Sequence, residues 1–224
     1  MNSLEELLEY VKVSLKEIES SEKKISRIIE AMKIIDRKFF VKNKKTAYHD
    51  LAIPINNNQT ISQPSTVARM LSILNPEKGE DILEIGSGSG WNASIIGYLC
   101  YPGKIKSLEV IEELAKKSEK NLEELKQNIS QDYRKRLNKI SFERKNIFRE
   151  EINENFDKII ITAGIKKRQE KYIEELASNY LKDNGKLICP YQKGPILIIK
   201  KRGNTLSKEY SNEYYLFVPL IINE

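Results

Sequence analysis

The run from Asp81 to Gly90, which reads Asp-Ile-Leu-Glu-Ile-Gly-Ser-Gly-Ser-Gly, constrains the fold of this chain more than any other segment. A short apolar stretch ends in an acid and then breaks into alternating glycines, which is typical of a buried strand that turns sharply into a helix. Glycines at such a turn adopt unusual backbone angles and leave room for a ligand against the main chain. The segment therefore predicts a strand, a tight ligand-binding loop and a helix that begins near residue 90.

The length and charge of this loop restrict the ligand. A phosphate-binding P-loop would place Gly-Lys-Ser or Gly-Lys-Thr here, and the stretch has no lysine. The dinucleotide fingerprint G-x-G-x-x-G is one residue longer than the G-x-G-x-G of residues 86–90. Glu84 disfavours phosphate and favours a cationic ligand, for which the ammonium group of S-adenosylmethionine is the usual example. A strand-to-helix turn that binds nothing is the alternative.

A second acid stands where a nucleoside site needs one. The apolar stretch 105–109 ends in Glu109, about twenty residues beyond the loop, where a carboxylate can accept hydrogen bonds from both hydroxyls of a ribose. A helix cap is the alternative role for an acid that ends a strand. A later strand ends in Thr162 and two small residues, which leave space for a reacting group. Because the carboxyl ends of parallel strands meet at one edge of a sheet, we expect these residues to surround one ligand.

From residue 81 onward the hydrophobic pattern alternates between strands and helices. Near-continuous apolar strands such as 158–161 are typical of a mostly parallel sheet that is covered on both faces. The last two strands follow each other without room for a helix, so we expect the sheet to end in a C-terminal antiparallel hairpin. The expected strands are 81–85, 105–109, 139–143, 157–162, 185–190, 195–201 and 213–219, and the expected helices are 90–99, 111–126 and 169–181.

The chain before residue 81 is expected to be helical with one irregular interruption. Apolar residues at three- and four-residue spacing predict helix over 4–35 and again over 65–75. We interpret the N-terminal stripes as core packing, with a dimer or partner helix as the alternative. Residues 39–64 are polar, rich in asparagine and interrupted by proline, which predicts a loop. The whole pattern predicts a Rossmann-like α/β fold preceded by a helical segment.

Composition and charge exclude several classes of protein. No apolar run approaches the roughly 20 residues of a membrane-spanning helix, and the N-terminal sequence is acidic, unlike a secretory signal. The net charge of +6 is spread over short basic clusters near acids, so we expect a solvated surface and no nucleic-acid partner. Cys100 and Cys189 have no companions at metal-ligand spacing, which predicts reduced cysteines, no metal and a cytoplasmic protein.

The run Gln59-Thr60-Ile61-Ser62-Gln63-Pro64, followed by Leu83–Gly90, resembles the protein-L-isoaspartate O-methyltransferase family, which writes these segments as Q-T-I-S-x-P and L-E-I-G-x-G-S-G. The first motif is far more specific than the glycine loop. Further segments agree in order and spacing, so the likeness covers roughly residues 25–222. They are Ala52–Ile55, which is similar to P-L-P-I; Phe156–Ala163, similar to Y-D-R-I-I-V-T-A; Leu181–Pro190, similar to L-K-P-G-G-R-L-V-I-P; and Phe217–Leu220.

The resemblance implies a methyltransferase domain over 25–224, with residues 1–24 as a helical N-terminal extension. This domain is expected to bind S-adenosylmethionine, release S-adenosylhomocysteine and methylate the free carboxylate of L-isoaspartyl residues in damaged proteins. That carboxylate is ionised at neutral pH, so no general base is required. Ser62 matches the family's active-site serine and is the expected catalytic residue, with Thr60 and Val218 as further substrate contacts. A helix N-cap is the alternative role for Ser62. We expect a monomer. The expected cofactor contacts are Gln59, Thr60, Ile61, Glu84, Gly86, Ser87, Gly88, Gly90, Glu109, Val110, Asn146, Ile147 and Thr162.

One segment departs from the family pattern. Where the family carries Gly-Asp-Gly, this chain has Lys145-Asn146-Ile147. Asn146 keeps an acceptor oxygen but loses the charge, which weakens the expected cofactor bond by about 1–2 kcal/mol. Two alternatives therefore stay open: a methyltransferase of the same fold that acts on RNA or another acceptor, and a non-catalytic relative that binds the cofactor or a protein without turnover. The intact Gln59–Pro64 motif opposes the first, and the retained Ser62, Glu84 and Glu109 oppose the second.

Overall fold

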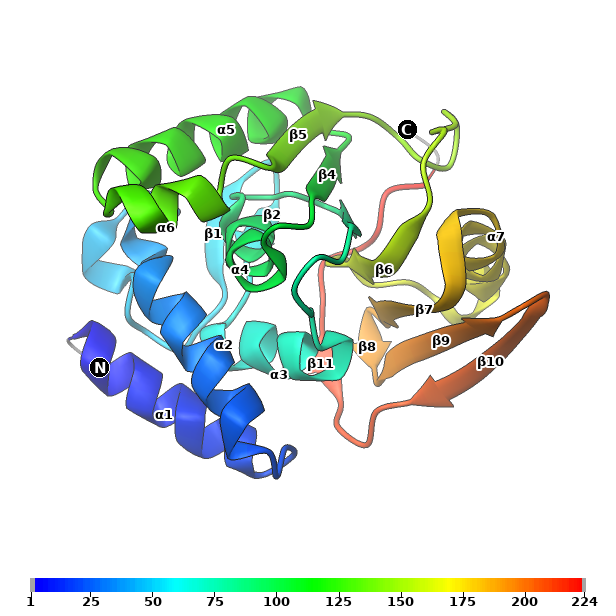
Figure 1. Ribbon diagram of the computed structural model, residues 1–224, viewed down its shortest axis with the longest axis horizontal. Helices are drawn as coiled ribbons and strands as arrows, with labels where there is room; N and C mark the ends of the chain where they lie inside the picture. Colours follow the sequence, from blue (N-terminus) through cyan, green and yellow to red (C-terminus); the bar gives the residue numbers. More distant parts are fainter. Residues whose placement is uncertain (1–2, 223–224) are drawn as a thin grey trace.

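The computed structural model describes residues 3–222. Residues 1–2 of the expected extension and residues 223–224 of the expected domain lie outside the described part. Within it, a seven-stranded sheet has the order β10-β9-β7-β6-β3-β4-β5 (Figure 1). The five neighbouring strands β7, β6, β3, β4 and β5 run parallel to one another. Strands β9 and β10 complete one edge of the sheet in antiparallel pairing, which confirms the expected α/β fold class. The strand bounds are β3 Ile82–Ile85, β4 Ile105–Glu109, β5 Ile140–Arg144, β6 Phe156–Ile161, β7 Leu181–Pro190, β9 Ile196–Arg202 and β10 Thr205–Tyr210.

Alternate residues along the strands point to opposite faces of the sheet, and each face has its own hydrophobic cluster. Ile82, Ile160 and Ile188 belong to the cluster that includes helices α1 to α5. Leu83 and Ile159 belong to the cluster on the other face, which includes α7 and the C-terminal segment. Both faces are therefore covered, as Figure 1 shows. The helix bounds are α1 Leu4–Lys16, α2 Glu22–Ile34, α3 Pro64–Leu74, α4 Trp91–Cys100, α5 Glu112–Gln127, α6 Gln131–Arg136 and α7 Glu170–Tyr180.

The segment 39–64, expected as a loop, contains a small β-hairpin. Strand β1 (Ile53–Asn56) pairs antiparallel with β2 (Gln59–Ile61). Asn57 and Asn58 form the turn with φ of 53° and 57°, a conformation that asparagine tolerates better than most residues. The remaining short elements are the two-stranded sheet of β8 (Lys193–Gly194) and β11 (Tyr215–Leu216) and the 3₁₀ helices Arg37–Phe39, Lys44–Thr46 and Lys167–Gln169.

Two boundaries expected from the sequence are wrong. The helix expected over 4–35 is two helices, because Ser21 starts a new one: its side chain accepts a hydrogen bond from the Lys24 backbone N–H. The strand expected over 213–219 is reduced to the two residues of β11. The C-terminal hairpin of the main sheet is instead made by β9 and β10. Residues 205–210, which form β10, are too polar for the sequence pattern to predict a strand there.

The N-terminal helices pack into the body of the chain. Leu7, Val11 and Leu15 of α1 are at most 1% exposed and share a cluster with Leu71 of α3. Arg69 of α3 reinforces this contact through hydrogen bonds to the Ser14 hydroxyl. The apolar stripes are therefore core packing, as interpreted. The division at residue 24 stays a prediction.

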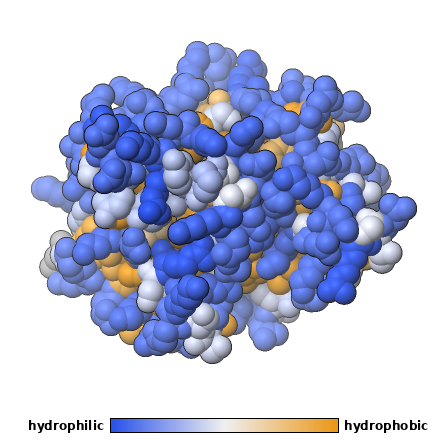
Figure 2. All heavy atoms as spheres, viewed as in Figure 1, coloured by the Kyte–Doolittle hydropathy of each residue, from blue (hydrophilic) through white to orange (hydrophobic). Residues whose placement is uncertain are grey.

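The surface seen in Figure 2 is mostly hydrophilic and is interrupted by small apolar patches. Helices long and apolar enough to cross a bilayer are absent from residues 3–222. The same residues contain no cluster of three potential metal-ligating side chains.

Candidate active site

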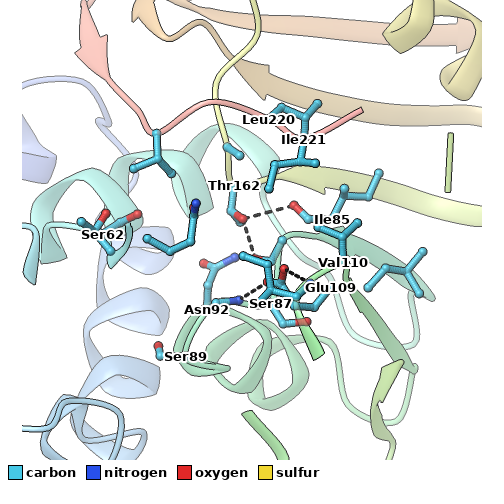
Figure 3. A pocket seen from close by; sticks show the side chains of 18 of the residues that line it. Ser62, Ile85, Ser87, Ser89, Asn92, Glu109, Val110, Thr162, Leu220 and Ile221 are labelled. Atoms are coloured by element: carbon cyan, nitrogen blue, oxygen red, sulfur yellow. Dashed lines mark hydrogen bonds between the residues drawn. The ribbon is translucent and has the colours of Figure 1, made fainter. Parts of the chain in front are cut away.

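The glycine loop follows β3 and leads into α4, as expected. Gly86, Gly88 and Gly90 have φ of 99°, 55° and 85°, values that other residues adopt only with strain. At Gly86 a Cβ atom would lie 2.5 Å from the Oγ1 of Thr162, so the loop and the end of β6 are in close contact. Thr162 donates to the carbonyl oxygens of Ile85 and Gly86, as Figure 3 shows. The loop therefore has its backbone fixed from the neighbouring strand.

Glu109 lies at the end of β4, directly beside this loop. Its carboxylate accepts hydrogen bonds from the backbone N–H groups of Gly88, at 3.0 Å, and Ile111, at 3.1 Å. The side chain is 6% exposed and lines the cavity. Its two carboxylate oxygens retain acceptor capacity beyond these two bonds, so a ligand diol can still bind there. The alternative role as a helix cap also applies in part, because the Ile111 N–H stands at the start of α5.

Glu84 takes a different position from the one that a direct ligand contact requires. Its side chain is fully buried beneath the loop and does not line the cavity. One oxygen accepts from Asn92 at 2.7 Å and the other from Ser107, whose hydroxyl also meets the hydroxyl of Ser87 at 2.6 Å. Burial raises the pKa of Glu84 to about 7, and the hydrogen bonds from Ser107 and Asn92 oppose this shift. Glu84 therefore reaches the cavity only through Ser87 and Asn92, which line it.

The cavity at the carboxyl ends of β3, β4 and β6 has an open space of about 930 Å³, its mouth included. The structure brings together nearly all the expected site residues here: Gln59, Thr60, Ile61, Ser62, Gly86, Ser87, Gly88, Glu109, Val110, Asn146, Ile147, Thr162 and Val218. Gly90 does not line the cavity. A Cβ atom at Gly90 would lie 3.0 Å from Ser118, so this glycine permits close packing of α4 against α5.

Ser62 lies on the α3 side of the cavity, and Glu109 and Val110 lie across it (Figure 3). The alternative role of Ser62 as a helix cap does not hold, because α3 has Gln63 at its N-cap position without a side-chain cap bond. The cap comes instead from Asp50, which accepts hydrogen bonds from the Ser65 backbone N–H and hydroxyl, both at 2.8 Å, and from Gln63 at 2.7 Å. This leaves the Ser62 hydroxyl available to a ligand.

A second hollow, the outer groove, opens on the other side of Ser62. Thr60, Ser62, Thr162 and Val218 line both the cavity and this groove. The groove continues between α1, α3 and the segment around β11. Ser62 therefore stands at the junction between an inner space, lined by the glycine loop and Glu109, and a surface channel.

Asn146, the departure from the family pattern, lines the cavity and is 8% exposed. Its side-chain oxygen accepts from the backbone N–H of Phe148 at 3.1 Å, and its amide donates to the carbonyl of Ile222 at 3.2 Å. Part of its hydrogen-bonding capacity therefore ties the end of β5 to the C-terminal segment.

Several residues of the site were not expected from the sequence. Asp50, Ser107 and Asn92 position the expected residues, and the apolar wall of the cavity includes Trp91 and Phe148. Ser107 had one signal in the sequence: it stands two residues before Glu109, so both side chains point to the same face of β4. The others depend on contacts between distant segments.

Comparison with known proteins identifies relatives of this chain. A sequence model of the family described as Protein-L-isoaspartate(D-aspartate) O-methyltransferase (PCMT) matches residues 10–224, so the match begins inside the expected extension. The chain is 34% identical over 204 residues to the protein-L-isoaspartate O-methyltransferase of Fervidobacterium nodosum, an alignment that covers 87% of this chain and 93% of that protein. It is 33% identical over 218 residues to the enzyme of that name from Methanospirillum hungatei, with coverage of 92% and 89%.

Solved structures support the same fold. A Plasmodium falciparum protein described as a protein-L-isoaspartate O-methyltransferase by assignment, crystallised with S-adenosyl-L-homocysteine, superimposes with a TM-score of 0.81 over the whole of both chains at 22% identity. Coclaurine N-methyltransferase gives a TM-score of 0.51 at 12% identity, over 86% of this chain and 59% of that one. These likenesses establish the fold, and the sequence matches establish the family. The chain belongs to the protein-L-isoaspartate O-methyltransferase family.

Proposed function

We propose that this protein transfers a methyl group from S-adenosylmethionine to the free carboxylate of L-isoaspartyl residues in damaged proteins. The observation that carries the proposal is the position of Ser62, where the inner cavity meets the outer groove. A methyltransferase needs such a junction, because donor and acceptor must meet at a point that each reaches from its own side.

The lining of the inner cavity fits S-adenosylmethionine. Glu109 offers carboxylate oxygens for the ribose hydroxyls, and apolar side chains such as Val110 and Ile147 offer a surface for the adenine. The glycine loop lets the main chain approach the ligand closely, and Ser87 links that ligand to the buried Glu84 through Ser107. When bound, S-adenosylmethionine supplies an electrophilic methyl group whose S–C bond breaks as a new O–C bond forms.

The residues on the groove side have a positioning role. The Ser62 hydroxyl can donate a hydrogen bond to the substrate carboxylate and hold one oxygen toward the cavity. The acceptor is already an anion at neutral pH, so the protein need not remove a proton. Thr60 and Val218 border the same junction and exclude water around it. Catalysis then consists of orientation and desolvation.

We further propose that the reaction takes place in the cytoplasm by a monomer. Cys100 and Cys189 are both buried and free, which is compatible with a reducing compartment. Fractionation of the source cells and size-exclusion chromatography with light scattering test these two statements directly.

The test is methyl transfer from labelled S-adenosylmethionine to a matched pair of peptides that differ only in an isoaspartyl or aspartyl linkage. Ser62→Ala removes the hydroxyl at the junction. Ser130→Ala is the matched control, since Ser130 lines neither space and its hydroxyl makes no cap bond with α6. We expect base-labile label on the isoaspartyl peptide alone, and a loss in kcat/KM of about 10- to 100-fold in Ser62→Ala, the range for one hydrogen bond to a charged group.

The other outcomes separate the alternatives. Cofactor binding without label on either peptide would exclude this acceptor and direct the search to RNA or another substrate. No cofactor binding at all would exclude a methyltransferase and favour a non-catalytic relative that binds only protein. A Ser62→Ala variant as active as the Ser130→Ala control would remove Ser62 from the reaction.

A further inference from the structure

The outer groove concentrates exposed apolar side chains. Among the described residues, three large hydrophobic side chains that line this groove are strongly exposed: Tyr10 at 52%, Tyr214 at 79% and Leu216 at 80%. The other large hydrophobic side chains that are strongly exposed belong to Val13, Leu51 and Tyr210, and they lie outside the groove. Exposed apolar groups gathered in one hollow mark a binding surface, whereas single ones need no explanation.

The two walls of the groove come from opposite ends of the chain. Tyr10 and Ser14, one helical turn apart on α1, form one wall, and the segment from Tyr214 to Val218 forms the other. Arg69 of α3 lies between them and fixes α1 through the hydrogen bonds to Ser14. Tyr10 is thus carried on a helix that is anchored to the body of the protein, and Tyr214 directly precedes β11, which pairs with β8.

The charge of the groove suits an anionic peptide. Its described lining includes the cations Arg69 and Lys193 and no aspartate or glutamate. Arg69 is paired with Glu17, so Lys193 is the more available of the two. At its inner end the groove reaches Ser62 and Thr162, which also line the cavity. A chain lying in the groove can therefore place one carboxylate at Ser62 and its flanking residues against the outer walls.

We propose that Tyr10, together with Tyr214 and Leu216, binds the residues that flank the isoaspartyl site, so that helix α1 and the segment around β11 together determine substrate preference. The preferred substrate is an extended, flexible segment with aromatic or aliphatic residues beside the isoaspartate. This proposal rests on the proposed function. All substrates of the proposed reaction present the same isoaspartyl carboxylate. The groove adds selectivity for the side chains that flank this carboxylate.

The experiment compares two isoaspartyl peptides of equal length, one flanked by phenylalanine and leucine and the other by glycine and serine. Both are assayed with the wild-type protein and with Tyr10→Ala, Tyr214→Ala and Leu216→Ala. The matched control is Val13→Ala, because Val13 is 57% exposed on the same helix but does not line the groove. The dissociation constant for S-adenosylhomocysteine is measured for each protein.

We expect the wild type to favour the apolar-flanked peptide. Each groove variant should raise KM for that peptide by about three- to tenfold, the size of one aromatic or aliphatic contact, with kcat and cofactor affinity unchanged. The glycine-flanked peptide should respond little. The Val13→Ala protein should match the wild type on both peptides.

Two results would overturn the inference while leaving the proposed function intact. In the first, the wild type methylates both peptides equally well and the groove variants match Val13→Ala. In the second, KM rises equally for both peptides together with weaker cofactor binding, which would show that the variants act through the packing of α1. If the wild type methylates neither peptide, it is the proposed function that fails.

Discussion

The guanidinium group of Arg37 donates a hydrogen bond of 3.0 Å to the carbonyl oxygen of Ser62, 25 positions further along the chain. The same side chain, 1% exposed, donates to the carbonyls of Ala47, His49 and Leu51. It also lies over the ring of Trp91, 5.3 Å from the ring centre. One buried cation therefore fixes both ends of the segment that carries the β1–β2 hairpin and places the backbone of Ser62.

Replacement of Arg37 by lysine should disturb the site from a distance. A lysine ammonium has three donors at one point and cannot reach four separate carbonyls, so we expect a loss of about 2–4 kcal/mol in the free energy of unfolding. The kcat/KM for an isoaspartyl peptide should fall at least about tenfold as Ser62 loses its position. Chemical denaturation and peptide kinetics measure the two effects. Lys38→Ala, one residue away and partly exposed, should change neither; equal effects in both variants would contradict this role.

Asp50 should control the start of α3. Its carboxylate caps this helix through Ser65 and binds Gln63, next to Ser62. Asp50→Ala should lower the free energy of unfolding by about 1–2 kcal/mol and raise KM for the peptide, because the first turn of α3 frays. Asn43→Ala removes a comparable cap from the 3₁₀ helix Lys44–Thr46 and should leave KM unchanged. A normal KM in the Asp50 variant would show that Ser62 is held by other contacts.

Alanine substitutions at Gly86 and Gly79 should distinguish the effect of backbone strain from the effect of a steric clash. Both have a positive φ, 99° and 87°, but a Cβ at Gly79 meets nothing within 4 Å, whereas one at Gly86 would lie 2.5 Å from Thr162 Oγ1. Gly79→Ala should cost about 1–2 kcal/mol of stability with normal cofactor binding. Gly86→Ala should cost more and abolish binding of S-adenosylhomocysteine in calorimetry. Similar binding by the two variants would exclude the loop from the cofactor site.

The buried Glu84 should make stability depend on pH. Its pKa rises from 4.5 to about 7 on folding because of burial, so the folded protein holds this proton more tightly than the unfolded chain. The resulting stabilisation is fully present below pH 4.5 and is lost as the pH rises through 7. Relative to Glu84→Gln, the wild type should therefore lose on the order of 3 kcal/mol of unfolding free energy across this window. Urea unfolding between pH 4.5 and 8.5 tests it, and parallel curves for the two proteins would contradict it.

Local pattern was enough to predict the elements that place the site. The apolar run that ends in Glu84, the alternating glycines and the acid at the end of 105–109 each depend on neighbouring residues, and β3, its loop and β4 formed as expected. The family motif at Gln59–Pro64 also identified the segment that faces the cavity. Patterns failed where the signal was weak, as in β10, an edge strand whose residues are mostly polar and are exposed at every position except the half-buried Leu206.

The sequence by itself determined the α/β alternation, the glycine loop and the residue types available for a nucleoside and a carboxylate, because periodicity and turn chemistry act over a few residues. Only the tertiary structure decided which of them face a ligand. The parallel register sets Glu84 opposite Ser107 and buries it, while Glu109 reaches the cavity. Arg37 and Asp50 hold Ser62 through contacts that span 10 to 25 positions and exist only after the chain has folded. Such long-range pairings depend on packing and register, which no local pattern encodes.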